Sequence, residues 1–185
     1  TQSNNTVNMV GLGPTFTSFT AGPVNTVIAP EIEISLADLE SKGDQSDDTV
    51  GFQVIALISG TLKIGTSSGS ATAVSGTNDI IGGSFKGFWT ADSAAVGKDL
   101  AGFTVAALDA VGNASTPPVS VYIAAIGSGV ASIAVDAFKG LSNLTSVTIP
   151  NSVQTIGNES FEDTGLTGAL VIPSGVTTIG NAAFN

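Results

Sequence analysis

The chain has 185 residues, of which 42% are hydrophobic and 11% are charged, so it holds enough apolar residues to bury a core. It carries 15 Asp and Glu against five Lys, a formal net charge of −10, and no Cys, His or Arg. This composition excludes nucleophile pairs and zinc sites built on His or Cys, and it excludes disulfides. The negative charge also disfavours nucleic acid and anionic membrane surfaces as partners.

The first segment, residues 1–13, is rich in Thr and Asn and is followed by Pro14, which predicts a linker or a lead-in strand. No apolar run approaches the roughly 18 to 20 residues that a membrane helix needs, so the sequence predicts no membrane insertion. The small, polar, Thr-rich composition is typical of secreted bacterial repeat proteins and predicts an extracellular or cell-surface location.

Residues 14–126 predict an antiparallel β-sandwich, because short strands rich in β-branched residues recur about every ten residues. Ser35 and Asp38 have the spacing of a capping box and predict one helix of about two turns at most, ended by Gly43. Trp89 is the only Trp, and we expect it to pack between the sheets. The clearest strands are predicted at 49–58, 60–65, 103–108 and 119–123.

A repeat with a period of 23 residues occupies 127–185. One coil of this length cannot bury its apolar face alone, so the coils are predicted to stack into a solenoid. Ser132, Thr155 and Thr178 share one phase and should form a hydroxyl ladder on its solvent side. The third copy stops after Phe184, so we expect this truncated array to continue into neighbouring repeats of a longer chain, and its end to be mobile or self-associating. The predicted core positions are Val130, Val153, Val176, Ile133, Ile156, Ile179, Phe138, Phe161 and Phe184.

Two stretches of the repeat, 137–150 and 153–161, resemble the BspA-type leucine-rich repeat of bacterial and protist surface proteins. The same pattern returns at Ile172-Pro173 and in residues 176–184. The resemblance implies a surface protein whose solenoid presents a binding face.

The preceding segment resembles the cadherin-like and immunoglobulin-like sandwich repeats of large bacterial adhesins, at Ile34-Ser35, Trp89-Thr90 and Phe103-Thr104-Val105. This resemblance implies an extended protein that calcium can stiffen. The predicted fold class is therefore mainly β: an antiparallel immunoglobulin- or cadherin-like sandwich over 14–126, followed by a truncated leucine-rich-repeat solenoid over 127–185.

Seven of the 15 acidic residues lie within residues 31–48. Carboxylates clustered on a turn suit Ca²⁺, which takes six to eight oxygen ligands in irregular geometry. The candidate metal ligands are Asp44, Asp47 and Asp48, joined by Asp109 from the 109–115 turn. The alternative is a solvated acidic loop in which Asp, Ser and Gly serve turn geometry.

The sequence predicts no catalytic residues, so we do not expect an enzyme. Residues 65–69 match the pattern G-x-S-x-G, but a serine there needs an imidazole partner and the chain has no His. A pair of carboxylates could hydrolyse a glycoside, yet such a site needs a sugar cleft lined by aromatic side chains, and aromatics make up only 6% of the chain.

Two functions remain open at this point. The first is a non-enzymatic segment of a secreted or cell-surface bacterial protein, in which a spacer sandwich carries a solenoid binding face for adhesion to an extracellular protein or glycan. The second is an accessory glycan-recognition module of a secreted hydrolase. No cofactor other than Ca²⁺ is expected for either.

Overall fold

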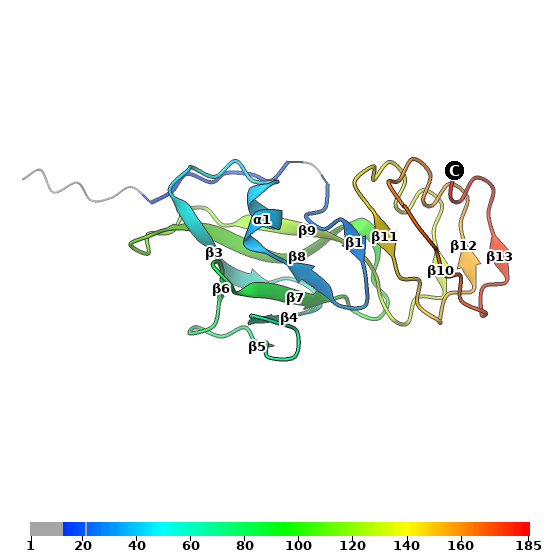
Figure 1. Ribbon diagram of the computed structural model, residues 1–185, viewed down its shortest axis with the longest axis horizontal. Coiled ribbons are helices and arrows are strands. Elements are labelled where there is room, and N and C mark those ends of the chain that lie inside the picture. The colour runs from blue at the N-terminus through cyan, green and yellow to red at the C-terminus, as the bar shows by residue number, and fades with distance from the viewer. Residues whose placement is uncertain (1–12, 21) are drawn as a thin grey trace, which may run out of the picture.

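The computed structural model describes residues 13–20 and 22–185, and it is mainly β, as predicted (Figure 1). The molecule is elongated, with two sheets toward one end and a series of short strands toward the other. The linker or lead-in strand predicted for 1–13 lies outside the described residues, apart from Gly13. Among the described residues, no helix is both long and apolar enough to cross a membrane.

Two four-stranded antiparallel sheets build the N-terminal unit, which comprises the described residues up to 126. The first sheet has the order β2-β7-β4-β5 and the second the order β6-β3-β8-β9. The strands of the first sheet are β2 (Ile32–Ile34), β7 (Lys86–Thr90), β4 (Thr61–Gly65) and β5 (Thr72–Ala73). Those of the second are β6 (Ile80–Ile81), β3 (Thr49–Leu57), β8 (Val96–Asp109) and β9 (Val119–Ile126).

Both sheets contribute side chains to one apolar cluster, the first core. In β2, Ile32 and Ile34 are buried while Glu33 between them is exposed, as the alternation predicts. Trp89 in β7 is fully buried in this cluster, and its indole N–H donates to the Ser59 carbonyl at 2.9 Å. The predicted position of Trp89 in the core is therefore confirmed.

The single helix of the described chain, α1 (Leu36–Glu40), follows β2 directly. The predicted capping box is present: the Ser35 hydroxyl accepts from the Asp38 amide at 3.2 Å, and the Asp38 carboxylate accepts from the Ser35 amide at 2.7 Å. Leu39 is the buried residue of the helix and belongs to the first core. Leu36 is partly buried against the same core, so both leucines hold this short helix against the sheets.

β8 is much longer than the strand predicted at 103–108, because it begins at Val96. Its pairing with β9 shifts register between Gly97 and Leu100 and again between Ala101 and Phe103. These irregularities accommodate the glycines of this stretch, which break the alternation of an ordinary strand. Because of these glycines, the first half of β8 lacks the alternation of apolar and polar residues that predicts a strand.

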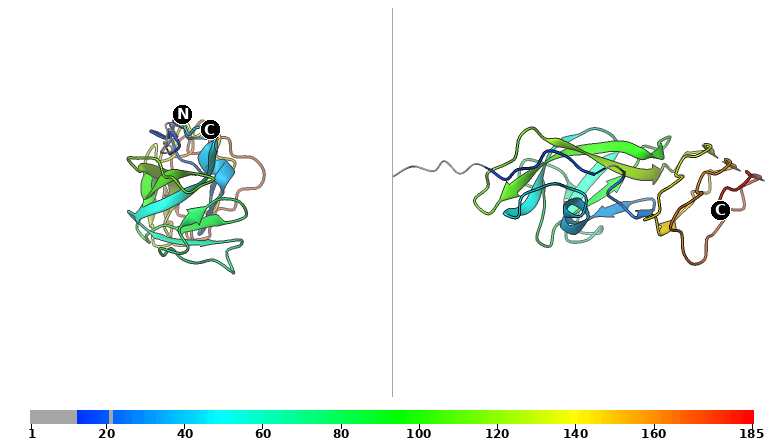
Figure 2. Two further views of the ribbon diagram at one scale, coloured as in Figure 1. Left: turned by 90° about the vertical axis from the view of Figure 1, so that its left-hand side faces the viewer. Right: turned by 90° about the horizontal axis from the view of Figure 1, so that it is seen from above.

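The remaining chain, 127–185, is the repeat region, and its strands are two residues long and parallel. β10 (Ser132–Ile133), β12 (Thr155–Ile156) and β13 (Thr178–Ile179) form one sheet, and successive turns follow one another along the long axis (Figure 2). β11 (Ser146–Val147) pairs instead with β1 (Val27–Ile28) of the N-terminal unit. A second core, separate from the first, fills the interior of the repeat region.

Candidate functional site

Asp44, the first predicted calcium ligand, is held by the segment around residue 17. Its carboxylate accepts from the amides of Thr17 and Ser18 at 2.8 and 2.9 Å and from their hydroxyls at 2.5 and 3.1 Å. These hydrogen bonds, that of the Thr17 hydroxyl first, hold the pKa of Asp44 well below its ordinary value. The carboxylate therefore ties the 44–48 loop to the start of the described chain.

Asp48 and Asp109 also accept hydrogen bonds from their own turns. Asp48 accepts from the Ser46 hydroxyl. Asp109 accepts from the Asn113 side-chain amide at 2.7 Å and from the Asn113 backbone amide at 2.8 Å, which lower the pKa of its carboxyl. Asp47 is exposed in the same loop as Asp48.

The two predicted halves of the calcium site do reach the same end of one sheet, because Thr49 of β3 pairs with Asp109 of β8. Within 13–20 and 22–185, however, no three acidic side chains converge closely enough to hold a metal ion. The hydrogen bonds described above show that Asp44, Asp48 and Asp109 stabilise their loops without a metal ion. Calcium binding at Asp44, Asp47, Asp48 and Asp109 stays a prediction.

The repeat region displays a regular polar row on its sheet of parallel strands. Ser132 pairs with Thr155, and Thr155 pairs with Thr178, so the three residues lie side by side on successive strands. Ser132 and Thr178 are exposed and Thr155 is half-buried. The predicted hydroxyl ladder is therefore confirmed, and we call these three residues the hydroxyl row.

The side chains behind the row form columns at the same 23-residue spacing. Phe138 and Phe161 stack with ring centroids 5.0 Å apart, and Phe161 and Phe184 stack at 5.2 Å with an interplanar angle of 5°. Ile133 and Ile156 are fully buried, whereas Ile179 is 51% exposed. The columns fix the spacing of the row, because each coil repeats the orientation of the previous one.

Lys139 is the one cationic residue in the sequence of the repeat region, and three acidic residues surround it. Its ammonium group forms ion pairs with Glu159 and Glu162, and Asp136 lies 4.0 Å away. These contacts, that with Glu159 first, raise the pKa of Lys139 above its ordinary value and lower that of Glu159. The ion pairs link the first coil to the second. The hydroxyl row consists of Ser and Thr and is itself uncharged.

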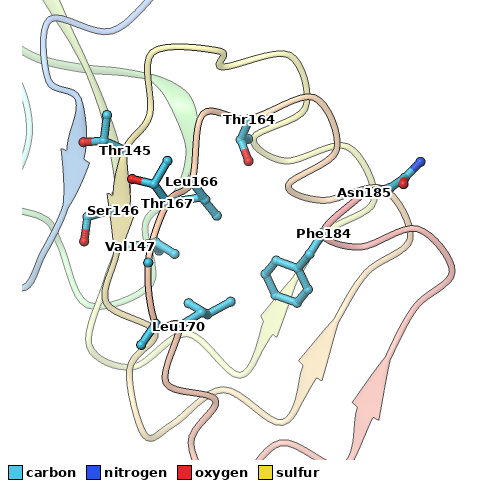
Figure 3. A pocket seen from close by; sticks show the side chains of 11 residues that line it. Thr145, Ser146, Val147, Thr164, Leu166, Thr167, Leu170, Phe184 and Asn185 are labelled. Atoms are coloured by element: carbon cyan, nitrogen blue, oxygen red, sulfur yellow. The ribbon is translucent and has the colours of Figure 1, made fainter.

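A cavity of about 380 Å³ opens beside β11, between residues 164–170 and the last two residues (Figure 3). Its apolar lining includes Leu166, Leu170 and Phe184, whose side chains point toward one another, and its polar lining includes Thr145 and Thr164. No residue that lines it is charged. No sequence pattern predicts this cavity, but Leu166 lies 22 residues after Leu144 and not 23, which indicates an irregular coil.

Together, the hydroxyl row and this cavity offer hydrogen-bonding hydroxyls and apolar edges, without any charged group. They can bind a surface by hydrogen bonds and apolar contact. Neither contains an acidic or basic side chain that could act as a general acid or base or activate one of the hydroxyls as a nucleophile.

Comparison with known families identifies the class of the repeat. Residues 120–185 match the family model described as BspA type Leucine rich repeat region (6 copies), which is about a third of the chain. Repeats of this family occur in bacterial surface proteins and act in protein interaction. Neither the curated proteins nor the solved structures gave a match to this chain.

Proposed function

We propose that this chain is a non-enzymatic segment of a secreted or cell-surface bacterial protein and that it binds an extracellular protein through its repeat region. In this proposal the N-terminal unit is an immunoglobulin- or cadherin-like sandwich that acts as a spacer. The repeat region is the start of a leucine-rich solenoid that presents the hydroxyl row to the partner. The proposal rests on one observation above all, the 23-residue register that places Ser132, Thr155 and Thr178 side by side.

The chemistry of the row supports a protein partner reached by many weak contacts. The row itself is uncharged, although the chain as a whole has a formal charge of −10, so a partner can hydrogen-bond to the row without burying a charged side chain of it. Rows of equivalent side chains on a repeat array present extended binding surfaces. The ion pairs of Lys139 support the same role, because they brace neighbouring coils.

The glycan-recognition alternative is supported by the hydroxyls of the row and by Phe184 at the cavity. Hydroxyl groups can hydrogen-bond to those of a sugar, and an aromatic ring can pack against its apolar face. We place this alternative second because one partly exposed ring, at 37%, offers a small sugar platform.

A binding assay with matched variants tests the proposal. Purified chain is applied to surfaces coated with fibronectin or collagen and, in parallel, to a glycan array. Ser132→Lys with Thr178→Lys puts two bulky cations on the row, and we expect this variant to lose most binding to the protein-coated surfaces. Ser75→Lys with Thr77→Lys is the control, because it makes the same change at two exposed residues of the N-terminal unit.

The outcomes separate the alternatives. Binding to a matrix protein that only the row variant loses supports the proposal. Binding confined to the glycan array, and lost in the row variant, supports the accessory glycan module instead. Equal loss in both variants would show that binding follows net charge and not the row.

A further inference from the structure

The end of the N-terminal unit that faces the repeat region is apolar and covered. Ile28 and Ala124 are fully buried, and Ile126 is 3% exposed. All three belong to the second core, with the repeat residues, and not to the first core. The N-terminal unit therefore contributes the first layer of the repeat interior.

The short strand β1 lies beside the first coil as a preceding coil would. Val27 pairs with Ser146 and Ile28 with Val147, in the parallel sense that also relates the strands of the repeat sheet (Figure 1). The amides of Thr145 and Thr148 donate to the carbonyls of Thr26 and Ile28 at 2.8 and 2.7 Å. β1 thus satisfies backbone groups on either side of β11 that the end of a repeat array leaves open.

A buried asparagine fixes β1 against the N-terminal unit. Asn25 is 5% exposed, and its side-chain amide donates to the carbonyls of Val27 and Ala124 at 2.8 and 2.9 Å. Its side-chain carbonyl accepts from the Ala124 amide at 2.9 Å. Three hydrogen bonds from one buried side chain therefore join β1 to β9, which leads directly into the first coil.

The opposite side of the junction is closed by the loop before β8. The amides of Gly127 and Gly129 donate to the carbonyls of Ala95 and Ser93 at 2.7 and 2.8 Å. A Cβ atom at Gly127 would lie 2.2 Å from the Asp92 carbonyl oxygen, so only glycine permits this approach. The Lys98 ammonium group donates to the Lys139 carbonyl at 2.8 Å.

From these contacts we infer that the N-terminal unit is the cap of the repeat array. Its end face, made of β1, Ala124 and Ile126, is an interaction surface whose partner is a parallel 23-residue coil. Repeat arrays need a distinct terminal layer, since an end coil otherwise exposes its apolar interior. The match to the repeat family begins at residue 120, inside β9, which agrees with this shared layer. The inference is independent of any external partner.

The cap also predicts that the repeat region depends on the N-terminal unit for its stability, whereas the N-terminal unit does not depend on the repeat region. The first core contains no residue of the repeat region, so the N-terminal unit has an interior of its own. The second core, in contrast, needs Ile28, Ala124 and Ile126. Weakening the end face should therefore loosen the repeats and leave the N-terminal unit folded.

A matched pair of variants on β1 tests this inference in the full chain. Ile28→Thr puts a hydroxyl into the second core, whereas Val27→Thr changes the neighbouring residue, which is 41% exposed. Hydrogen exchange of β10 and β12 reports on the repeats. Emission of Trp89 reports on the N-terminal unit, because Trp89 is the only Trp and lies in the first core.

For Ile28→Thr we expect amide exchange at β10 and β12 to accelerate at least about tenfold, with the Trp89 emission and the exchange of β3 and β8 unchanged. For Val27→Thr we expect exchange close to that of the unaltered chain. Equal exchange in the two variants would overturn the inference, because the end face would then not support the repeats. Loss of the Trp89 environment in Ile28→Thr would overturn it as well, since a cap with its own core must survive.

Discussion

The Asp44 carboxylate is held by hydrogen bonds from a segment outside its own loop. Four hydrogen bonds from Thr17 and Ser18 converge on its carboxylate. The same side chain was predicted as a metal ligand from the acidic composition of the loop. Composition cannot tell these roles apart, because Asp stabilises a turn through the same oxygens that would bind Ca²⁺.

The lowered pKa of Asp44 predicts a pH-dependent contribution to stability. A carboxyl whose pKa is lower in the folded chain stabilises the fold above the unfolded-state pKa, near 4, and this contribution is lost as the pH falls toward the folded-state pKa. We expect Asp44→Asn to lower the free energy of unfolding at neutral pH and to show a flatter decline below about pH 4. Urea denaturation at a series of pH values, followed by Trp89 emission, measures this. Asp47→Asn, at an exposed aspartate of the same loop, is the control, and identical profiles for both variants would contradict the prediction.

Ser160 predicts a stabilising substitution. Its hydroxyl is fully buried and has no hydrogen-bond partner among the described residues. The positions one period away hold Ala137 and Ala183, so the column accepts a methyl group at this place. Because an unpaired buried hydroxyl costs about 1–3 kcal/mol, we expect Ser160→Ala to raise the free energy of unfolding by roughly 1 kcal/mol. Chemical denaturation measures the change against Ser132→Ala on the exposed row, and a less stable Ser160→Ala would contradict the account.

At the scale of elements, the sequence predicts best where one residue pattern recurs. The Phe and Ile columns follow from the 23-residue period alone, and the stacked rings confirm that alignment. The capping box of α1 and the alternation in β2 are local patterns, so the sequence predicts them equally well. Such features depend on residues close in sequence or at a fixed spacing.

Other elements depend on pairings that no local pattern records. β1 has only two residues, and its partner β11 lies 119 positions further along, as the pairing of Ile28 with Val147 shows. The first half of β8 is a strand because it pairs with β9, despite its glycines. The cavity beside β11 depends on an irregular coil, so the period could not predict it.

The columns predict a graded response to truncation of isoleucine. Ile156 is fully buried between neighbouring coils, whereas Ile179 is 51% exposed in the last strand. Ile156→Ala should lower the free energy of unfolding of the repeats by about 2–5 kcal/mol, the range for a buried isoleucine, and Ile179→Ala should cost clearly less. Denaturation followed by circular dichroism compares the two. Equal losses would show that the coils do not share one interior.

The predicted calcium ligands lie at one end of the β3–β8 pair, and their role can be tested. If Asp44, Asp47, Asp48 and Asp109 bind Ca²⁺ in the folded chain, millimolar Ca²⁺ must raise the unfolding temperature and EDTA must lower it again. Asp109→Asn should remove the calcium-dependent part of the shift. Scanning calorimetry with and without chelator measures this, and an unchanged midpoint would leave the turn role as the whole explanation.

At the scale of the whole molecule, the two parts follow one another along the long axis (Figure 2). A buried apolar layer joins them. The chain passes from β9 into the first coil through Gly127, whose surroundings exclude any side chain. β1 adds a second connection from a distant part of the sequence. An N-terminal unit joined in this way can hold the hydroxyl row at a fixed position relative to its own sheets.

The central claim is that coils 23 residues apart share one interior that begins on the N-terminal unit. Proton NOE spectra of the isotope-labelled 185-residue chain test it. We expect cross-peaks between the ring protons of Phe138 and Phe161, and between the methyl groups of Ile28 and Val147. A well-dispersed spectrum that lacks both sets of cross-peaks would contradict the claim.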